Sequence, residues 1–305
     1  MRIINLIENT PGRPGCAYAH GLSFYIETAN HKLLLDLGPS EETLENASKI
    51  GIDLTQVDTV VLSHGHYDHS GGLMAFMDVN KNATIYMQKL AGEDYFADDG
   101  VAATGATKID DGENAATGAT KTDDGENAAT GERYRYIGID KNILQNPNVK
   151  LIQGDYQIDD ELDIFTIEKR ARKLPFTNKR LLQKIDGSFV RDDFKHEHYL
   201  VITDDDKKIL LSGCAHQGII SIMEAYHEHY NSYPDEVVSG FHLFKKNADY
   251  SDEELQEIRD IAEELKKYPT HFVTCHCTGV PAYEEMKNIL GDQLDYVHSG
   301  DEVEV

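Results

Sequence analysis

The chain has 305 residues, of which 40% are hydrophobic and 27% charged, enough for the core of one large domain or two ordinary ones. Aspartate and glutamate number 54 against 29 lysines and arginines, so the formal net charge is −25. An acidic surface repels the phosphates of nucleic acids and anionic lipid headgroups, which argues against nucleic acid and membrane as partners.

Neither an export signal nor a membrane span is visible in the sequence. The first residues, MRIINLIENT, lack a basic stretch followed by an apolar run, and no later run approaches the roughly 18 apolar residues of a span. The four cysteines, Cys16, Cys214, Cys275 and Cys277, are too few and too scattered for a disulfide framework. We therefore expect a cytoplasmic protein with thiols available as ligands; the sequence holds no signal for an oligomeric state.

The first third of the chain alternates strand-like and helix-like segments. Residues 22–38 predict a β-hairpin, and residues 41–50 a short helix that ends at a glycine. A buried strand follows at 59–63, then a helix over 73–77 and a strand over 83–87. This alternation predicts an α/β fold.

A low-complexity segment interrupts the pattern. Residues 105–117 recur at 118–130 with one change, Thr122 in place of Ile109, and a partial third copy begins at Asp99. A polar unit of 13 residues cannot bury a core. We interpret residues 99–131 as a solvated loop insertion within a single domain that spans residues 1–305.

The second half returns to strands and helices. Residues 149–152 and 162–167 are strand-like, and residues 198–212 form the clearest hairpin of the chain. Between them, residues 168–196 are a basic excursion, either a solvated segment or part of a pocket rim that receives an anionic substrate. Its cations are concentrated at residues 169–173 and 179–180.

Two helices and a strand complete the pattern. Residues 218–229 predict a helix, and Ser251 with Glu254 forms a capping box at the start of another. The stripe of Leu255, Ile258, Ile261 and Leu265 gives that helix one apolar face. Residues 270–276 predict a final buried strand.

The strand at 59–63 leads directly into HGHYDH, with four potential metal ligands, His64, His66, Asp68 and His69, in six residues. A tight non-helical turn there can point the first two histidines one way and the last two ligands the other, so that one loop serves two metal ions. Imidazole and carboxylate suit Zn²⁺, Mn²⁺ or Fe²⁺, with Zn²⁺ the first choice. We expect one or two divalent ions here.

The remaining ligands should lie at other strand ends. His216 and His276 follow apolar strands and are favoured as ligands, while Cys214 is as well explained as a small buried apolar residue. His196 and His242 are interpreted as hydrogen-bonded histidines beside the site. Cys275 and Cys277 alternate with His276, so in an extended strand they would face away from it.

These motifs resemble those of the metallo-β-lactamase superfamily. SHGHYDH is similar to its metal-binding signature, and LLLDLG, which contains Asp36, is similar to its first motif. HGLSF from His20, LSGCAHQGI from Leu211, GFHL from Gly240 and HCTG from His276 resemble one branch. That branch contains metal-dependent hydrolases and relatives of a pterin-type ribofuranosylaminobenzene 5′-phosphate synthase.

The resemblance implies an αββα sandwich with the site at one edge, between two sheets. It assigns His64 and His66 to one metal, Asp68 and His69 to a second, and His276 to the last histidine motif. Cys214 stands where many members have a bridging aspartate, and a thiolate there would be a softer, non-bridging ligand. His196 and His216 are both candidates for the third-motif histidine.

The resulting hypothesis is a hydrolase that uses a metal-activated hydroxide on an ester, thioester, amide or phosphoester of a small molecule. Asp68 would be a ligand or move a proton, Asp36 would fix a histidine tautomer, and His20, His196 and His242 would support the site or contact substrate. A transferase acting on a phosphorylated pterin or ribofuranosyl-type substrate and a non-catalytic metal- or ligand-binding protein are the alternatives. An anionic small molecule is compatible with each of them.

Overall fold

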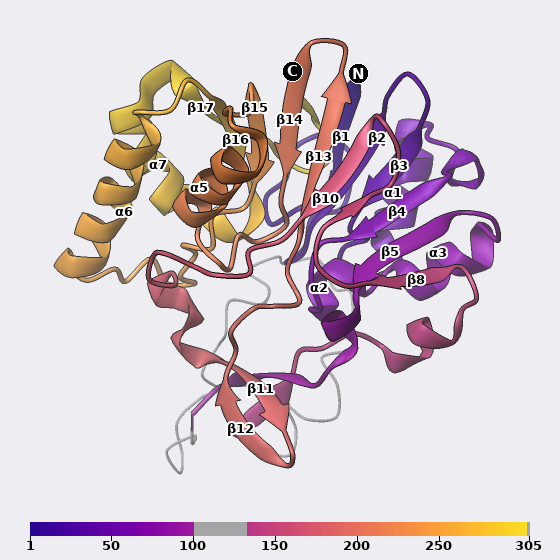
Figure 1. Cartoon of the computed structure of the whole chain (residues 1–305), viewed down its shortest axis with the longest axis horizontal. Helices are drawn as coiled ribbons and strands as arrows, with labels where there is room; N and C mark the ends of the chain where they lie inside the picture. Colours follow the sequence, from indigo (N-terminus) through magenta and orange to yellow (C-terminus); the bar gives the residue numbers. More distant parts are fainter. Residues whose placement is uncertain (101–132, 304–305) are drawn as a thin grey trace.

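The computed structural model describes residues 1–100 and 133–303. Two seven-stranded sheets pack face to face, and helices cover the outer face of each sheet, in an αββα arrangement (Figure 1). A third, four-stranded sheet lies at one edge of the sandwich, at the bottom of the view. No helix of the described part is both long and apolar enough to span a bilayer.

The first sheet belongs mainly to the N-terminal half of the chain. In spatial order its strands are β18 (Glu302–Val303), β1 (Arg2–Ile7), β2 (Ser23–Glu27), β3 (Lys32–Leu35), β4 (Thr59–Leu62), β5 (Thr84–Gln88) and β8 (Val149–Ile152). Pairing is antiparallel from β18 to β3 and parallel from β3 to β8.

The second sheet has the same division into an antiparallel and a parallel part. Its strands, in spatial order, are β17 (Leu294–Tyr296), β16 (His271–Thr274), β15 (Glu236–Ser239), β14 (Lys207–Leu211), β13 (Tyr199–Asp204), β10 (Leu162–Phe165) and β9 (Tyr156–Gln157). The strands from β14 to β17 are parallel, so their carboxyl ends lie at one edge of the sheet.

The small sheet is built from two hairpin-like pairs far apart in sequence. Its order is β12 (Ser188–Arg191), β11 (Leu181–Ile185), β6 (Tyr95–Asp98) and β7 (Tyr134–Tyr136). It therefore joins the chain that flanks the insertion to the basic excursion at 168–196, which forms a hairpin here.

Helices cover both outer faces. The α-helices of the described residues are α1 (Glu42–Ile50), α2 (Tyr67–Ser70), α3 (Leu73–Val79), α5 (Ile219–Tyr230), α6 (Asp252–Leu265) and α7 (Val280–Leu290). The short 3₁₀ helices are η1 (Leu54–Gln56), η2 (Lys89–Gly92), η3 (Lys141–Gln145), η4 (Phe176–Arg180), η5 (His276–Thr278) and η6 (Gly291–Gln293). Figure 1 shows α1 and α3 on the outside of the first sheet and α5, α6 and α7 on the outside of the second.

Strand β3 illustrates how the core forms. Leu33 and Leu35 pack with residues of the second sheet, such as Leu200, whereas Leu34 packs with Phe76 of α3 on the other face. Because side chains alternate along a strand, a strand covered on both faces must be apolar at every position. Full burial of each such side chain stabilises the fold by about 1.5–3 kcal/mol.

The predicted fold class and its αββα sandwich are confirmed. The hairpin at 22–38 appears as β2 and β3, the hairpin at 198–212 as β13 and β14, and both residues of the predicted capping box cap α6. The insertion predicted at 99–131 lies outside the described residues except for Asp99 and Gly100.

The predicted final strand is too long. Strand β16 ends at Thr274, and the chain turns at His276, whose φ of 46° lies in the left-handed region, into the 3₁₀ helix η5. The prediction that Cys277 faces away from His276 is therefore wrong, since both line the same pocket, while Cys275 packs in the core between the sheets.

Candidate metal centre and pocket

The loop after β4 carries four of the candidate ligands. Ser63 to Gly65 follow the strand, and His66 is the N-cap residue of the short helix α2, which holds Asp68 and His69. The predicted non-helical turn is wrong for residues 67–70, which form one helical turn. All four candidate ligands are buried.

The second sheet supplies the other candidates from the carboxyl ends of its parallel strands. Cys214 and His216 follow β14, His242 follows β15 and His276 follows β16. Because those strand ends share one edge of the sheet, Cys214 and His276, which are 62 positions apart in sequence, both reach the loop after β4. The αββα packing thus brings the two sets of loops together.

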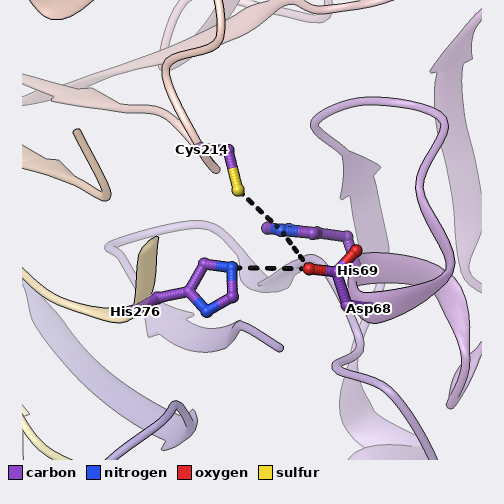
Figure 2. A group of neighbouring side chains, drawn as sticks. All are labelled: Asp68, His69, Cys214 and His276. Carbon is purple, nitrogen blue, oxygen red and sulfur yellow. Dashed lines mark hydrogen bonds and ion pairs between the residues drawn. The ribbon is translucent and has the colours of Figure 1, made fainter. Parts of the chain in front are cut away.

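Two groups of potential ligand atoms lie side by side, each with its atoms within 4.8 Å of one another. One contains His64, His216 and Cys214; the other contains Asp68, His69, His276 and Cys214. Figure 2 shows the second group, whose side chains converge from α2 and from the loops after β14 and β16. Cys214 belongs to both groups.

The distances are those of side chains that face a common centre. His64 Nε2 lies 3.2 Å from His216 Nε2, His69 Nε2 lies 3.1 Å from Cys214 Sγ, and Asp68 Oδ2 lies 3.5 Å from His276 Nε2. The last two contacts are drawn in Figure 2. Tetrahedral ligation by imidazole at about 2.0–2.1 Å and thiolate at about 2.3 Å requires donors that converge in this way.

The two candidates for the third-motif histidine occupy different positions. The Gly65 N–H donates to His196 Nδ1 at 2.9 Å, and His196 Nε2 donates to Asp192 at 3.0 Å, so both ring nitrogens of His196 have protein partners. His216 instead bonds Asn178 through Nδ1 at 3.1 Å and directs Nε2 to His64. The geometry therefore favours His216.

Two of the candidate ligands have a buried ring nitrogen without a hydrogen-bond partner among the described residues. These atoms are His66 Nε2 and His276 Nε2. An unpaired buried polar atom costs about 1–3 kcal/mol, so the site is unfavourable unless something binds these atoms. Together with the mixed imidazole, carboxylate and thiol donors, they fit a borderline divalent ion such as Zn²⁺.

The electrostatics of the cluster also suit metal ligation. Burial, reinforced by neighbouring histidines, holds the pKa of His64 and His216 well below the ordinary value, and it lowers that of His66 to about 3. Burial also acts to lower the pKa of His69, but Asp36 and Asp68 outweigh it and raise that pKa to about 9. Three imidazoles are therefore neutral near pH 7, whereas an ion bound by His69 would displace a proton.

Asp36 orients ligands of both groups on the first sheet. Its carboxylate accepts the Ser63 N–H at 2.7 Å and the Ser63 hydroxyl at 2.6 Å, and it lies 2.6 Å from His69 Nδ1. Ser63 Oγ in turn lies 2.9 Å from His64 Nδ1. The loop after β14 can pack this closely against Ser63 because residue 213 is a glycine, and a Cβ there would lie 2.3 Å from Ser63 Oγ.

Two buried glutamates hold the ligand loops of the second sheet. Glu197 accepts the N–H groups of His216 at 2.7 Å and Gln217 at 2.9 Å. Glu8, just after β1, accepts the N–H of His276 at 2.9 Å and the hydroxyl of Tyr296 at 3.0 Å. Each glutamate thus fixes the backbone of one candidate ligand.

Four non-glycine residues around the centre have left-handed backbone conformations. Asp36, Ala215, His242 and His276 have φ values of 61°, 52°, 51° and 46°. Such conformations cost on the order of 1–3 kcal/mol each and persist where surrounding contacts enforce them. Here they turn the chain sharply after β3, β14, β15 and β16, at the strand ends that carry the candidate site.

A cavity of about 440 Å³ opens onto the cluster. His66, Asp68, Cys214, His216 and His276 line it, so both groups of candidate ligands are accessible to a small molecule. His20 and His242, which the sequence assigned to support or substrate contact, also line it. His20 Nε2 lies 3.4 Å from Asp68 Oδ2, and the His242 ring centroid lies 4.1 Å from that of His216.

Sequence reasoning missed Glu8, Glu197 and the position of Cys277. Glu197 lies inside the motif KHEH, in which the histidines are the more obvious candidate ligands. Glu8 follows a short strand and belongs to no motif. Cys277 joins Cys214 and His242 in a further group of potential ligand atoms. No local sequence signal distinguishes either glutamate from the 52 other acidic residues of the chain.

Comparison with known proteins agrees with this architecture. Residues 19–127 match the family model of the metallo-beta-lactamase superfamily. The crystal structure of Tm1679, a metal-dependent hydrolase of the beta-lactamase superfamily, has a TM-score of 0.75 and 26% identity, and the match covers 100% of this chain and 99% of that one. The chain therefore has the fold of metallo-β-lactamase superfamily proteins, and its residues 19–127 are similar to that family in sequence.

Two relatives from Methanocaldococcus jannaschii match nearly the whole chain. One is 7,8-dihydropterin-6-methyl-4-(beta-D-ribofuranosyl)-aminobenzene-5′-phosphate synthase, 26% identical over 317 residues that cover 98% of this chain and 95% of the synthase. The other is an uncharacterized protein, 26% identical over 299 residues, with 97% and 96% covered. The predicted relation to this branch of the superfamily is thus confirmed.

Proposed function

We propose that the protein is a metal-dependent hydrolase of a small molecule, acting on an ester, thioester, amide or phosphoester. The observation that carries the proposal is the convergence of seven buried donors from three loops, five of which line one cavity. The donors are His64, His66, Asp68, His69, Cys214, His216 and His276.

In this proposal the donors hold one or two divalent ions, Zn²⁺ before Mn²⁺ or Fe²⁺. His64, His66, His216 and Cys214 would hold the first ion. Asp68, His69 and His276 would hold the second, and Cys214 belongs to both groups of potential ligand atoms. A bound ion would supply a water of lowered pKa as nucleophile and polarise the scissile bond.

The residues of the chain position the reactants. Asp36 keeps Nδ1 of His69 engaged, so that Nε2 faces the centre. Asp68 carries its negative charge on the cavity wall because His69, His276 and His20 hold its pKa well below the usual range against the opposing effect of burial. If Asp68 is not used as a ligand, its Oδ2 is placed to accept a proton from a reacting group.

Synthase-type transfer is the second candidate, and it rests on the relative of that name, which matches almost the whole chain at 26% identity. Both candidates share the same donors and cavity. A cytoplasmic location, proposed with either activity, agrees with the four free cysteines.

The test combines metal analysis with a substrate screen. We expect the purified protein loaded with Zn²⁺, Mn²⁺ or Fe²⁺ to hydrolyse at least one of a panel of generic esters, thioesters and phosphodiesters. The double variant His66→Ala/His69→Ala should lose metal and turnover together, whereas His227→Ala, at an exposed histidine of α5, should keep both. A metal-free double variant with full activity would refute the proposal.

A further inference from the structure

Cys277 lies beside the candidate metal centre but belongs to neither of its two groups of donors. Its Sγ, the Sγ of Cys214 and one ring nitrogen of His242 lie within 4.8 Å of one another. Two donors bound to one ion at about 2.0–2.3 Å lie at most about 4.6 Å apart, so small adjustments of the side chains bring all three onto a common ion. This set differs from the two groups in composition, because two of its three donors are sulfur.

The three donors occupy equivalent positions in neighbouring loops of the second sheet. Strands β14, β15 and β16 are adjacent and parallel. Cys214, His242 and Cys277 are each the third residue after the end of one of these strands. Because parallel strands end at one edge of a sheet, equivalent positions in the loops that follow them lie side by side. A metal site at this place therefore needs no donor from the first sheet.

Backbone hydrogen bonds connect the three loops to one another. The Gly240 N–H donates to the Gly213 carbonyl at 2.9 Å. The N–H groups of Leu243 and Phe244 donate to the Cys277 carbonyl, each at 2.8 Å. Residue 240 must be a glycine for the thiol to fit, because a Cβ there would lie 2.5 Å from Cys277 Sγ. The fold thus positions Cys277 beside the other two loops before any ion is bound.

Cys275 and Cys277 are only two residues apart but have different surroundings. Cys275 packs in the apolar core between the sheets and does not line the cavity. Cys277, Cys214 and His242 all line the cavity, and Cys277 Sγ donates to the Cys214 carbonyl at 3.5 Å. His242 Nδ1 is buried and has no hydrogen-bond partner within residues 1–100 and 133–303. The second sheet thus presents two thiols and one imidazole to the same cavity.

We propose that Cys214, Cys277 and His242 bind a soft metal ion, of the class of Cu⁺ and Cd²⁺, with a further coordination position open to the cavity. Thiolates select soft ions, whereas the imidazole and carboxylate donors of the two groups suit Zn²⁺. Each thiol releases its proton to solvent when its sulfur binds the ion. The soft-ion site goes beyond the proposed hydrolase function, because it requires neither turnover nor a donor of the first sheet. It shares Cys214 with the two groups, so an ion bound here competes with theirs for that sulfur.

The experiment titrates the zinc-loaded protein with Cd²⁺ and follows the ultraviolet sulfur-to-cadmium charge-transfer absorption, whose intensity increases with the number of bound thiolates. We expect one Cd²⁺ per chain with the absorption of two thiolates. Cys277→Ser should remove about half of this absorption and weaken Cd²⁺ binding about tenfold or more, equivalent to about 1.4 kcal/mol. His242→Ala, which keeps both thiols, should weaken Cd²⁺ binding without lowering the absorption at saturation.

The matched controls are Cys275→Ser and Cys16→Ser. Cys275 is the neighbouring buried thiol outside the cavity lining, and Cys16 is a partly exposed thiol far along the chain that reports adventitious Cd²⁺ binding. Both variants should keep the affinity and the absorption of the wild type. A single bound thiolate in the wild type, an unchanged affinity in Cys277→Ser, or equal losses in Cys277→Ser and Cys16→Ser would overturn the inference.

The outcome is distinguishable from that of the hydrolase proposal. Cd²⁺ binding that depends on Cys277 and His242, in a protein without turnover when loaded with Zn²⁺, Mn²⁺ or Fe²⁺, would support the soft-ion site and refute hydrolysis. Turnover in a protein whose Cd²⁺ binding is insensitive to Cys277→Ser would support hydrolysis and refute the soft-ion site.

Discussion

The two sheets contribute to the candidate metal centre in different ways. The first sheet supplies four donors within six residues of one loop, and a single carboxylate, Asp36, reaches ligands of both groups. The second sheet supplies Cys214, His216 and His276 from two loops, each held by its own buried glutamate.

The contacts that position the candidate ligands differ in how far apart the two partners lie in the sequence. Asp36 lies 33 residues from His69, whereas Glu8 lies 268 residues from His276. The first half of the centre can therefore form once β3 and β4 pair. His276 is held only in the completed sandwich, because Glu8 belongs to the opposite sheet, whereas Glu197 lies only 19 residues from His216.

The largest effect is expected from removing two donors of one group at a time. His64→Ala/His216→Ala should abolish binding of one ion, and His69→Ala/His276→Ala should abolish binding of the other, since each change removes two ligands. Metal content by mass spectrometry of the purified variants measures this directly. If each double variant instead lost every ion, the groups would act as one site and the comparison of two groups would fail.

Asp36→Asn should weaken both ions together. The amide keeps the shape of the carboxylate but cannot accept all three contacts to Ser63 and His69, so both His64 and His69 lose their orientation. Loss of such outer contacts costs about 10–100-fold in metal affinity. Competition titration with a chelator measures the two affinities, and a change confined to one ion would contradict the shared role of Asp36.

The glutamates of the second sheet should each act on one ion. Glu197→Gln should weaken the ion held with His216, and Glu8→Gln the ion held with His276, by on the order of tenfold each. The amide of either variant would place an NH₂ group where a backbone N–H now donates.

Glu236→Gln provides the matched control for both glutamates. Glu236 is also buried, but it lies at the start of β15, the end of the strand away from His242, and hydrogen-bonds His271 at 2.8 Å. A Co²⁺-loaded sample gives a ligand-field spectrum that reports on ligation, which a purely structural effect would leave unchanged. Identical spectra for wild type, Glu197→Gln and Glu8→Gln would remove the proposed positioning role.

Whether a residue of the site can be predicted from the sequence depends on whether local or distant contacts position it. HGHYDH places its donors by a local turn, so spacing alone identified the cluster, and the strand-end positions of His216 and His276 added two more. The choice between His196 and His216 depended on which ring nitrogens the fold already satisfies. The small sheet was missed because its strands pair across the insertion. Nothing in the sequence of residues 95–98 or 181–185 indicates that these two segments pair with each other.

The smallest expected effect lies in the first sheet away from the centre, at the β2–β3 turn. His31 lies 2.8 Å from both Asp58 and Asp159, and although partial burial lowers its pKa, these two contacts outweigh burial and leave the pKa raised. A raised pKa in the folded state stabilises the protein below the ordinary value near 6.5, and that contribution disappears as the pH rises through the folded-state value. Because both carboxylates are exposed, the contribution is about 0.2–1 kcal/mol.

This contribution is measured by denaturant unfolding at pH 6 and pH 9, as the difference in the free energy of unfolding between the wild type and each variant. His31→Gln should lower the free energy of unfolding at pH 6 by more than at pH 9, whereas His227→Gln, at an exposed position on α5, should show no such difference. The metal affinities should be unchanged in both, because neither residue belongs to the two groups or lines the cavity. A pH-independent effect of His31→Gln would show that the imidazole stabilises the turn by hydrogen bonding in its neutral form and not by its charge.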